Sequence, residues 1–104
     1  MKRYFIKIDT EALSDIQEIA DWYEAQKEGL GYKFRSTVIE QIDRLTSNPQ
    51  LFATRYREIR CMLVKKFPYM VHFYINSQTF TVEILAVIST DRNPKIGQEK
   101  TGKI

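Results

Sequence analysis

Residues 60–92 decide the fold and read RCMLVKKFPYMVHFYINSQTFTVEILAVISTDR. Apolar runs rich in β-branched and aromatic residues fill this stretch, and only two short breaks, at 67–68 and 76–78, interrupt them. Runs of this kind with brief polar or proline-containing breaks are typical of antiparallel strands joined by tight turns. The stretch therefore predicts a β-meander, with extended chain already present from residue 55 to residue 66.

Side chains alternate along the meander, so each strand presents two different faces. We expect the helices to cover the face that carries Tyr69, Val71, Phe73 and Ile75 of the central strand and Phe80, Val82, Ile84, Ala86 and Ile88 of the last strand. The opposite face, called the open face below, is then expected to carry Met70, His72, Tyr74, Leu85 and Val87, together with Cys61 and Leu63 of the preceding strand. An exposed face this apolar usually marks a surface that binds a protein.

The first half of the chain predicts one strand and two helices. Residues 4–8 alternate like a strand, and residues 11–26 carry an apolar stripe with helical spacing: Leu13, Ile16, Ile19, Ala20 and Tyr23, with Trp22 beside it. Gly29 is suited to end this helix, and a second helix is expected over residues 32–47, before Asn48-Pro49. Leu51-Phe52 is expected to anchor the passage into the sheet. The predicted fold class is α+β: a strand, an antiparallel helix hairpin and a meander, with both helices on one face.

Composition describes an ordinary globular domain. The 104 residues are 43% hydrophobic and 28% charged, with a formal net charge of +3. We expect one domain over residues 1–92 and a polar, mobile tail over residues 93–104. The single cysteine excludes an internal disulfide and suits the reducing cytoplasm, and no ligand spacing for a metal or motif for a cofactor is present. No apolar run is long enough to span a membrane.

Several short motifs, in this order and spacing, resemble the RelE/ParE family of bacterial toxins. They are Tyr23-Glu24-Ala25-Gln26, Gly29-Leu30-Gly31, Asn48-Pro49, Phe67-Pro68-Tyr69, Ala86-Val87 and Arg92-Asn93-Pro94. The resemblance covers nearly the whole chain, and the last arginine motif with Phe67-Pro68-Tyr69 is closer to the ParE branch. It implies a RelE-like fold and a toxin of a type II toxin–antitoxin module, associated with growth inhibition and plasmid stabilisation. The implied partner is an acidic antitoxin that wraps the toxin.

The two branches of this family differ in target. RelE-like members cut messenger RNA on the ribosome, whereas ParE-like members inhibit DNA gyrase without known nuclease chemistry. RelE-like nucleases place lysines and arginines on the open face, where positive charge stabilises the phosphate during cleavage. Here Met70 stands where an arginine is expected, and Cys61 and Leu63 stand where lysines are expected. The resemblance therefore favours a ParE-like protein that binds gyrase over an enzyme.

Two alternatives stay open. A RelE-like endoribonuclease would have to use a rearranged catalytic set, for which the candidates are Arg57, Arg60, Lys65, His72 and Arg92. A degenerate member would bind an antitoxin without being toxic. For binding a target or partner, the candidate residues are Arg60, Met70, Tyr74, Leu85 and Arg92.

Overall fold

The computed structural model describes residues 3–91, and its sheet runs through the whole domain. The elements in chain order are β1 (Phe5–Ile8), α1 (Thr10–Gln26), α2 (Leu30–Asp43), two 3₁₀ turns (Arg44–Thr46 and Pro49–Leu51), β2 (Thr54–Tyr56), β3 (Ile59–Leu63), β4 (Tyr69–Asn76) and β5 (Thr81–Ser89). The sheet has five strands in the order β1-β5-β4-β3-β2. β1 pairs with β5 in parallel, and the other neighbours pair antiparallel. The predicted meander is therefore confirmed, with β1 added along its far edge.

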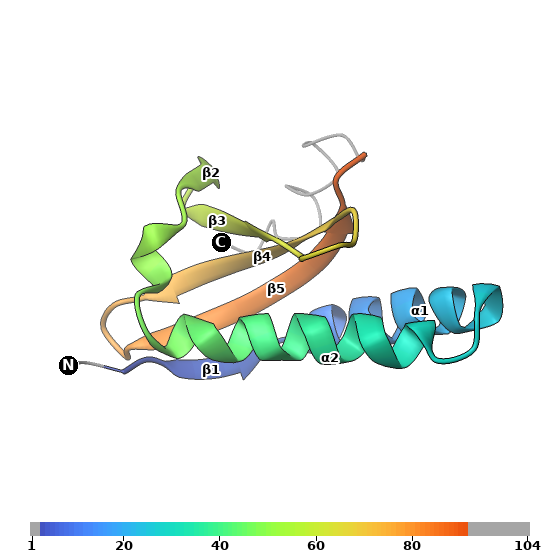
Figure 1. Cartoon of the computed structure of the whole chain (residues 1–104). Helices are drawn as coiled ribbons and strands as arrows, with labels where there is room; N and C mark the ends of the chain where they lie inside the picture. The colour runs from blue at the N-terminus through green and yellow to red at the C-terminus, as the bar shows by residue number, and fades with distance from the viewer. Residues whose placement is uncertain (1–2, 92–104) are drawn as a thin grey trace.

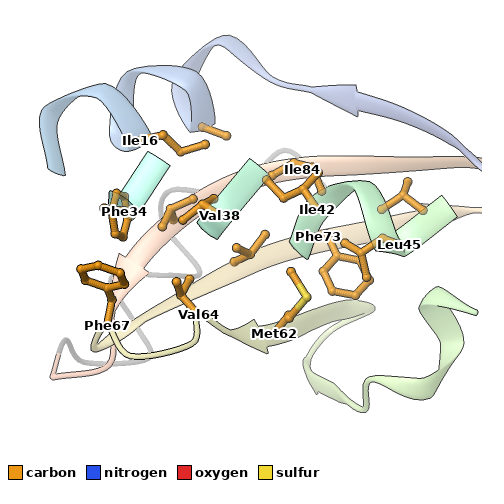
Figure 2. Packing of buried hydrophobic residues seen from close by; sticks show 14 of the residues in the cluster. Ile16, Phe34, Val38, Ile42, Leu45, Met62, Val64, Phe67, Phe73 and Ile84 are labelled. Atoms are coloured by element: carbon orange, nitrogen blue, oxygen red, sulfur yellow. The ribbon is translucent and has the colours of Figure 1, made fainter. Parts of the chain in front are cut away.

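Both helices lie on one face of the sheet, as predicted (Figure 1). The core fills the space between the helices and the sheet, and Figure 2 shows side chains from α1, α2, β3, β4 and β5 meeting there. Phe34, Val38 and Phe73 are fully buried. The predicted central row of Tyr69, Val71, Phe73 and Ile75 belongs to this core or packs against it. The α+β fold class is confirmed.

Two positions that were expected to be buried are exposed instead. Leu13 of α1 keeps 50% of its surface exposed, and Leu51 keeps 82%. Phe52 does contact the core, with its ring 6.0 Å from that of Phe73. Only one half of the predicted Leu51-Phe52 anchor therefore packs, because the 3₁₀ turn that ends at Leu51 directs the two side chains differently.

The segment predicted as one extended run from residue 55 to residue 66 is a hairpin. β2 ends at Tyr56, and β3 begins at Ile59. Arg57, between them, has φ 48°, which is the left-handed backbone conformation of a tight turn. The polar residues at this point are consequently turn residues and not one side of a longer strand.

A β-bulge in β5 changes which side chains face the helices. Phe73 pairs with Ile84, but its neighbour His72 pairs with Ala86, so Leu85 is an extra residue in β5. One extra residue reverses the alternation that follows it. Val87 is therefore 3% exposed in the core, although the open face was predicted for it.

Ala86 and Ile88, predicted to face the helices, lie on the open face. They pair with His72 and Met70 respectively, and directly opposed residues share one face. Neither belongs to the core cluster between the sheet and the helices.

The helix hairpin is held together at its closed end. Gly29 has φ 88°, the left-handed conformation expected after the first helix. Two carboxylate oxygens of Glu24 accept hydrogen bonds from the backbone N–H groups of Gly29 at 2.8 Å and Gly31 at 2.9 Å. Glu24 thus supplies the side-chain cap at the start of α2, where the residue at the cap position is a glycine.

Acid is expected to weaken this cap. The bond from Gly29, followed by that from Gly31, lowers the pKa of Glu24 below its ordinary value of 4.5. The stabilisation is fully present above the unfolded-state pKa and is lost as the pH falls through the lower folded-state pKa. We expect Glu24→Gln to flatten the acid limb of the free energy of unfolding, measured by urea denaturation over a pH series. The neighbouring Glu28→Gln is the control; an equal effect there would contradict the assignment.

Candidate functional site

The open face is built from cross-strand rows of side chains. In one row Leu63, Met70 and Ile88 lie side by side on β3, β4 and β5. In the next row Cys61, His72 and Ala86 do the same. This register confirms that Cys61 and Leu63 share the open face with Met70 and His72. The first row is entirely apolar, and 58% of Leu63 is exposed.

A histidine marks the polar centre of this face. His72 is 9% exposed, and its Nδ1 lies 2.8 Å from the hydroxyl of Tyr56 and 3.5 Å from Sγ of Cys61. Tyr56 comes from β2, so its side chain reaches across the position of β3 to β4. The pair can exchange a proton, which is the chemistry expected of a general acid or base.

Cys61 is not poised as a nucleophile. Burial raises the pKa of its thiol to about 11, and the charge of Arg55 offsets this only in part. A thiol with so high a pKa stays protonated at neutral pH, whereas the thiolate is the reactive form. Cys61 is therefore expected to be inert at neutral pH.

The residues proposed for a rearranged nuclease site are not gathered in one place. Arg60 pairs with Phe73 and lies on the helix side of β3, where its guanidinium donates hydrogen bonds to the carbonyl oxygens of Gln50 at 3.1 Å and Phe52 at 2.6 Å. It therefore fixes the loop before β2 and lies on the side of the sheet opposite the open face.

The structure also places two further candidates, Lys65 and Arg57, in different parts of the molecule. Lys65 follows β3, and its backbone N–H donates to Oε1 of Gln41 on α2 at 2.8 Å. Lys65 also lines a pocket together with Glu40 and Gln41 of α2, which places it beside that helix. Arg57 occupies the β2–β3 turn beside Tyr56. Arg92 and the predicted tail at 93–104 lie outside the described residues.

Of the residues predicted to bind a target or partner, three occupy the expected face. Met70 and Tyr74 follow the alternation of β4, with part of each side chain exposed, and Leu85 is the bulge residue of β5, 7% exposed. Arg60 faces the other way, and Arg92 is not described. The open face is thus mainly apolar around one polar pair. Leu63, Met70 and Tyr74 are its accessible residues, whereas Cys61, His72, Leu85, Ala86 and Ile88 are buried.

Sequence reasoning missed Tyr56 and Asp15. Tyr56 was missed because the hairpin turn at Arg57 was interpreted as continuous strand. Had a turn been predicted there, the alternation of β2 would have shown which face Tyr56 occupies. Asp15 is 7% exposed, and its carboxylate accepts a hydrogen bond from the backbone N–H of Val87 at 2.9 Å. No local signal marks this contact, because its partner is 72 residues away in the chain.

The described residues show neither a metal site nor a membrane-spanning helix. Within residues 3–91, no three His, Cys, Asp or Glu side chains gather in a way that could hold a metal ion. None of the helices in this range is both long and apolar enough to cross a membrane.

Comparison with protein families gives a clear match. The family described as the ParE toxin of the type II toxin–antitoxin system parDE matches residues 6–94. No curated protein matches the chain in sequence.

Solved structures share the fold at low sequence identity. A chain of the chromosomal ParDE toxin–antitoxin system from P. aeruginosa has a TM-score of 0.73 at 19% identity, over 84% of this chain and 96% of that one. A mutant of the E. coli toxin RelE in the free state also has a TM-score of 0.73, at 15% identity over 98% of each chain. A chain of the RelBE2 toxin–antitoxin complex from Mycobacterium tuberculosis has a TM-score of 0.63 at 19% identity, over 86% and 93%. The fold is therefore common to ParE-type and RelE-type structures.

Proposed function

Because this chain belongs to the ParE toxin family of type II toxin–antitoxin systems, we propose that it inhibits DNA gyrase by binding and has no nuclease chemistry. We further propose that an acidic antitoxin neutralises it. The observation that carries the choice of target is the apolar row of Leu63, Met70 and Ile88 on the open face, in which Leu63 is exposed, Met70 is half-buried and Ile88 lies buried behind them. A face of this kind suits contact with a protein better than contact with a phosphate backbone.

The placement of the cations supports the same choice. Cleavage of RNA requires positive charge held close to the phosphate as charge develops on it. The guanidinium of Arg60 donates to two loop carbonyls, and Lys65 lines a pocket with residues of α2. Neither group is directed at the His72–Tyr56 pair. A nuclease built on this face would lack two of its candidate cations.

The antitoxin is expected to use the edges of the sheet as well as the helix hairpin. β1 and β2 are the two edge strands, and an edge strand can accept an added strand from a partner through backbone hydrogen bonds. Apolar contacts are expected to contribute more to this complex than surface charges. Such a partner would leave the toxin inactive while bound.

Leu63→Asp is the sharpest test of the gyrase proposal. It places a charge at the most exposed position of the apolar row, and we expect inhibition of gyrase supercoiling by the purified protein to fall about thirtyfold, since an anchoring contact of an interface typically contributes about 2 kcal/mol. Leu51→Asp is the matched control, because Leu51 is an equally apolar and even more exposed leucine in the turn before β2. Supercoiling that the unmodified protein leaves unaffected would rule the proposal out.

A RelE-like nuclease is the second candidate, and the 2.8 Å contact between Tyr56 and His72 favours it. A general acid or base of this kind contributes about a hundredfold or more to a reaction rate. If the protein cut messenger RNA on the ribosome through this pair, Tyr56→Phe would lower cleavage by about that factor. We expect growth arrest to persist in Tyr56→Phe, measured as colony formation after induction without antitoxin. Normal growth on expression of the unmodified chain would instead identify a member without toxicity.

A further inference from the structure

A slot lies between α1 and the adjoining ends of β4 and β5. It encloses about 260 Å³ and is lined by Asp15, Glu18, Ile19, Trp22, Tyr69, Val87, Ile88 and Ser89. The described residues that line it are apolar, aromatic, acidic or hydroxyl-bearing, and none is lysine, arginine or histidine. The slot borders the apolar core on one side and solvent on the other.

An exposed tryptophan forms one wall. Trp22 keeps 57% of its surface exposed. Its ring meets that of Tyr23 edge-on at 5.1 Å, and Tyr23 in turn packs on Phe34 at 5.6 Å and Phe67 at 5.0 Å. The indole is therefore supported by an aromatic cluster that continues into the core. A large aromatic side chain that is held in place yet left exposed is the type of residue that dominates binding energy at protein interfaces.

Negative charge lies beside the indole. Asp15 is 7% exposed and is fixed in position by the hydrogen bond from the backbone N–H of Val87. Glu18 is exposed and, among the residues described, forms no ion pair. An aromatic face next to carboxylates attracts a cation, and the apolar floor suits the aliphatic stem of a long basic side chain.

We propose that this slot receives an arginine of the antitoxin that is flanked by apolar residues. The assignment rests on the proposed partnership with an antitoxin, and charge complementarity decides the chemistry of the occupant. The exposed carboxylate of Glu18 favours a basic over an acidic residue at the one antitoxin position that enters the slot. The slot would thus set the register in which the antitoxin segment lies along α1.

Peptide binding in the slot can be measured directly by the fluorescence of Trp22, because it is the only tryptophan in the chain. The full-length protein is titrated with a short acetylated and amidated peptide in which one arginine is flanked by leucines, and the emission of Trp22 is followed. The comparison peptide carries glutamate in place of the arginine. We expect saturable binding that is about tenfold tighter for the arginine peptide, which is the size expected of a cation–π contact together with an ion pair.

Substitutions on α1 separate the slot from general attraction between charges. Glu18→Gln is expected to reduce the preference for arginine by about threefold, because one exposed ion pair is lost. Glu11→Gln removes an exposed carboxylate of the same helix that does not line the slot and is expected to leave the preference unchanged.

Results of three kinds would overturn the proposal. The first is equal binding of the two peptides, or an equal effect of the two substitutions. The second is emission that changes on dilution without peptide, which would assign the slot to a second copy of the chain. The third is a change in the emission of Trp22, measured without peptide, in the full-length variants Arg92→Gln or Lys95→Gln. That result would show that residues of the same chain occupy the slot. The titration involves neither gyrase nor a whole antitoxin, so its failure leaves the proposed function standing, and failure of the gyrase test leaves the titration valid.

Discussion

Gly31→Ala is expected to destabilise the protein by about 3 kcal/mol, the upper range for forcing extra volume into a packed contact. A Cβ at this position would lie 2.3 Å from the carbonyl oxygen of Ala20, in the other helix. That oxygen belongs to the backbone of α1 and cannot turn aside as a flexible side chain could. The helices of the hairpin would have to separate at their closed end, and the bonds to Glu24 would weaken with them.

Thermal and urea unfolding measure this effect. For a domain of this size, 3 kcal/mol corresponds to a fall in the melting temperature of about 15 °C. Ser36→Ala is the matched control, because Ser36 is an exposed residue of the same helix, and it is expected to change the free energy of unfolding by about 0.5 kcal/mol or less. If Gly31→Ala were as harmless as the control, the close approach of the two helices at this glycine would be wrong.

Asp15→Leu is expected to cost about 2 to 3 kcal/mol, since it leaves the buried N–H of Val87 without its acceptor and removes a charge-assisted hydrogen bond. The contact has a clear structural reason. β1 ends at Ile8, opposite Ile84 of β5, so within residues 3–91 no strand pairs on that side with the part of β5 beyond the bulge. The carboxylate of Asp15 takes the place of the missing strand at Val87.

Asp15→Asn separates the hydrogen bond from the packing. It keeps an acceptor oxygen in the same position, so we expect a loss of about 1 kcal/mol, because only the contribution of the charge is removed. Urea unfolding gives both values, and amide hydrogen exchange at Val87 should accelerate in Asp15→Leu much more than in Asp15→Asn. Equal losses in the two variants would show that the hydrogen bond is not the source of the stabilisation.

The predicted and observed faces of the sheet agree where local alternation decided them. Met70, His72, Cys61 and Leu63 were assigned to the open face from alternation alone, and the register of β3 and β4 confirms it. Val87 was assigned to the wrong face because a single inserted residue, Leu85, reverses the alternation within one strand. Such a bulge depends on the register in which β5 pairs with β4. The alternation of residues within β5 does not reveal that register.

The contacts of Arg60 could not be predicted from the sequence either. Arg60 was a candidate for binding or catalysis because it is a cation at the start of an apolar strand. Its guanidinium instead holds the carbonyls of Gln50 and Phe52, and these acceptors are available only once the 3₁₀ turn has brought that loop against β3. The role of a long polar side chain is decided by the acceptors that surround it after folding.

The sequence by itself determined the helix hairpin, the meander, the common face of the two helices and the apolar character of the open face. These features follow from the periodicity of neighbouring residues, which reflects burial within each element. Only the tertiary structure decided that Tyr56 meets His72, that Asp15 completes β5 and that Trp22 stands exposed beside two carboxylates. Each of these depends on the bulge, the hairpin turn or the packing of α1 on β5, and therefore on contacts between residues distant in the chain.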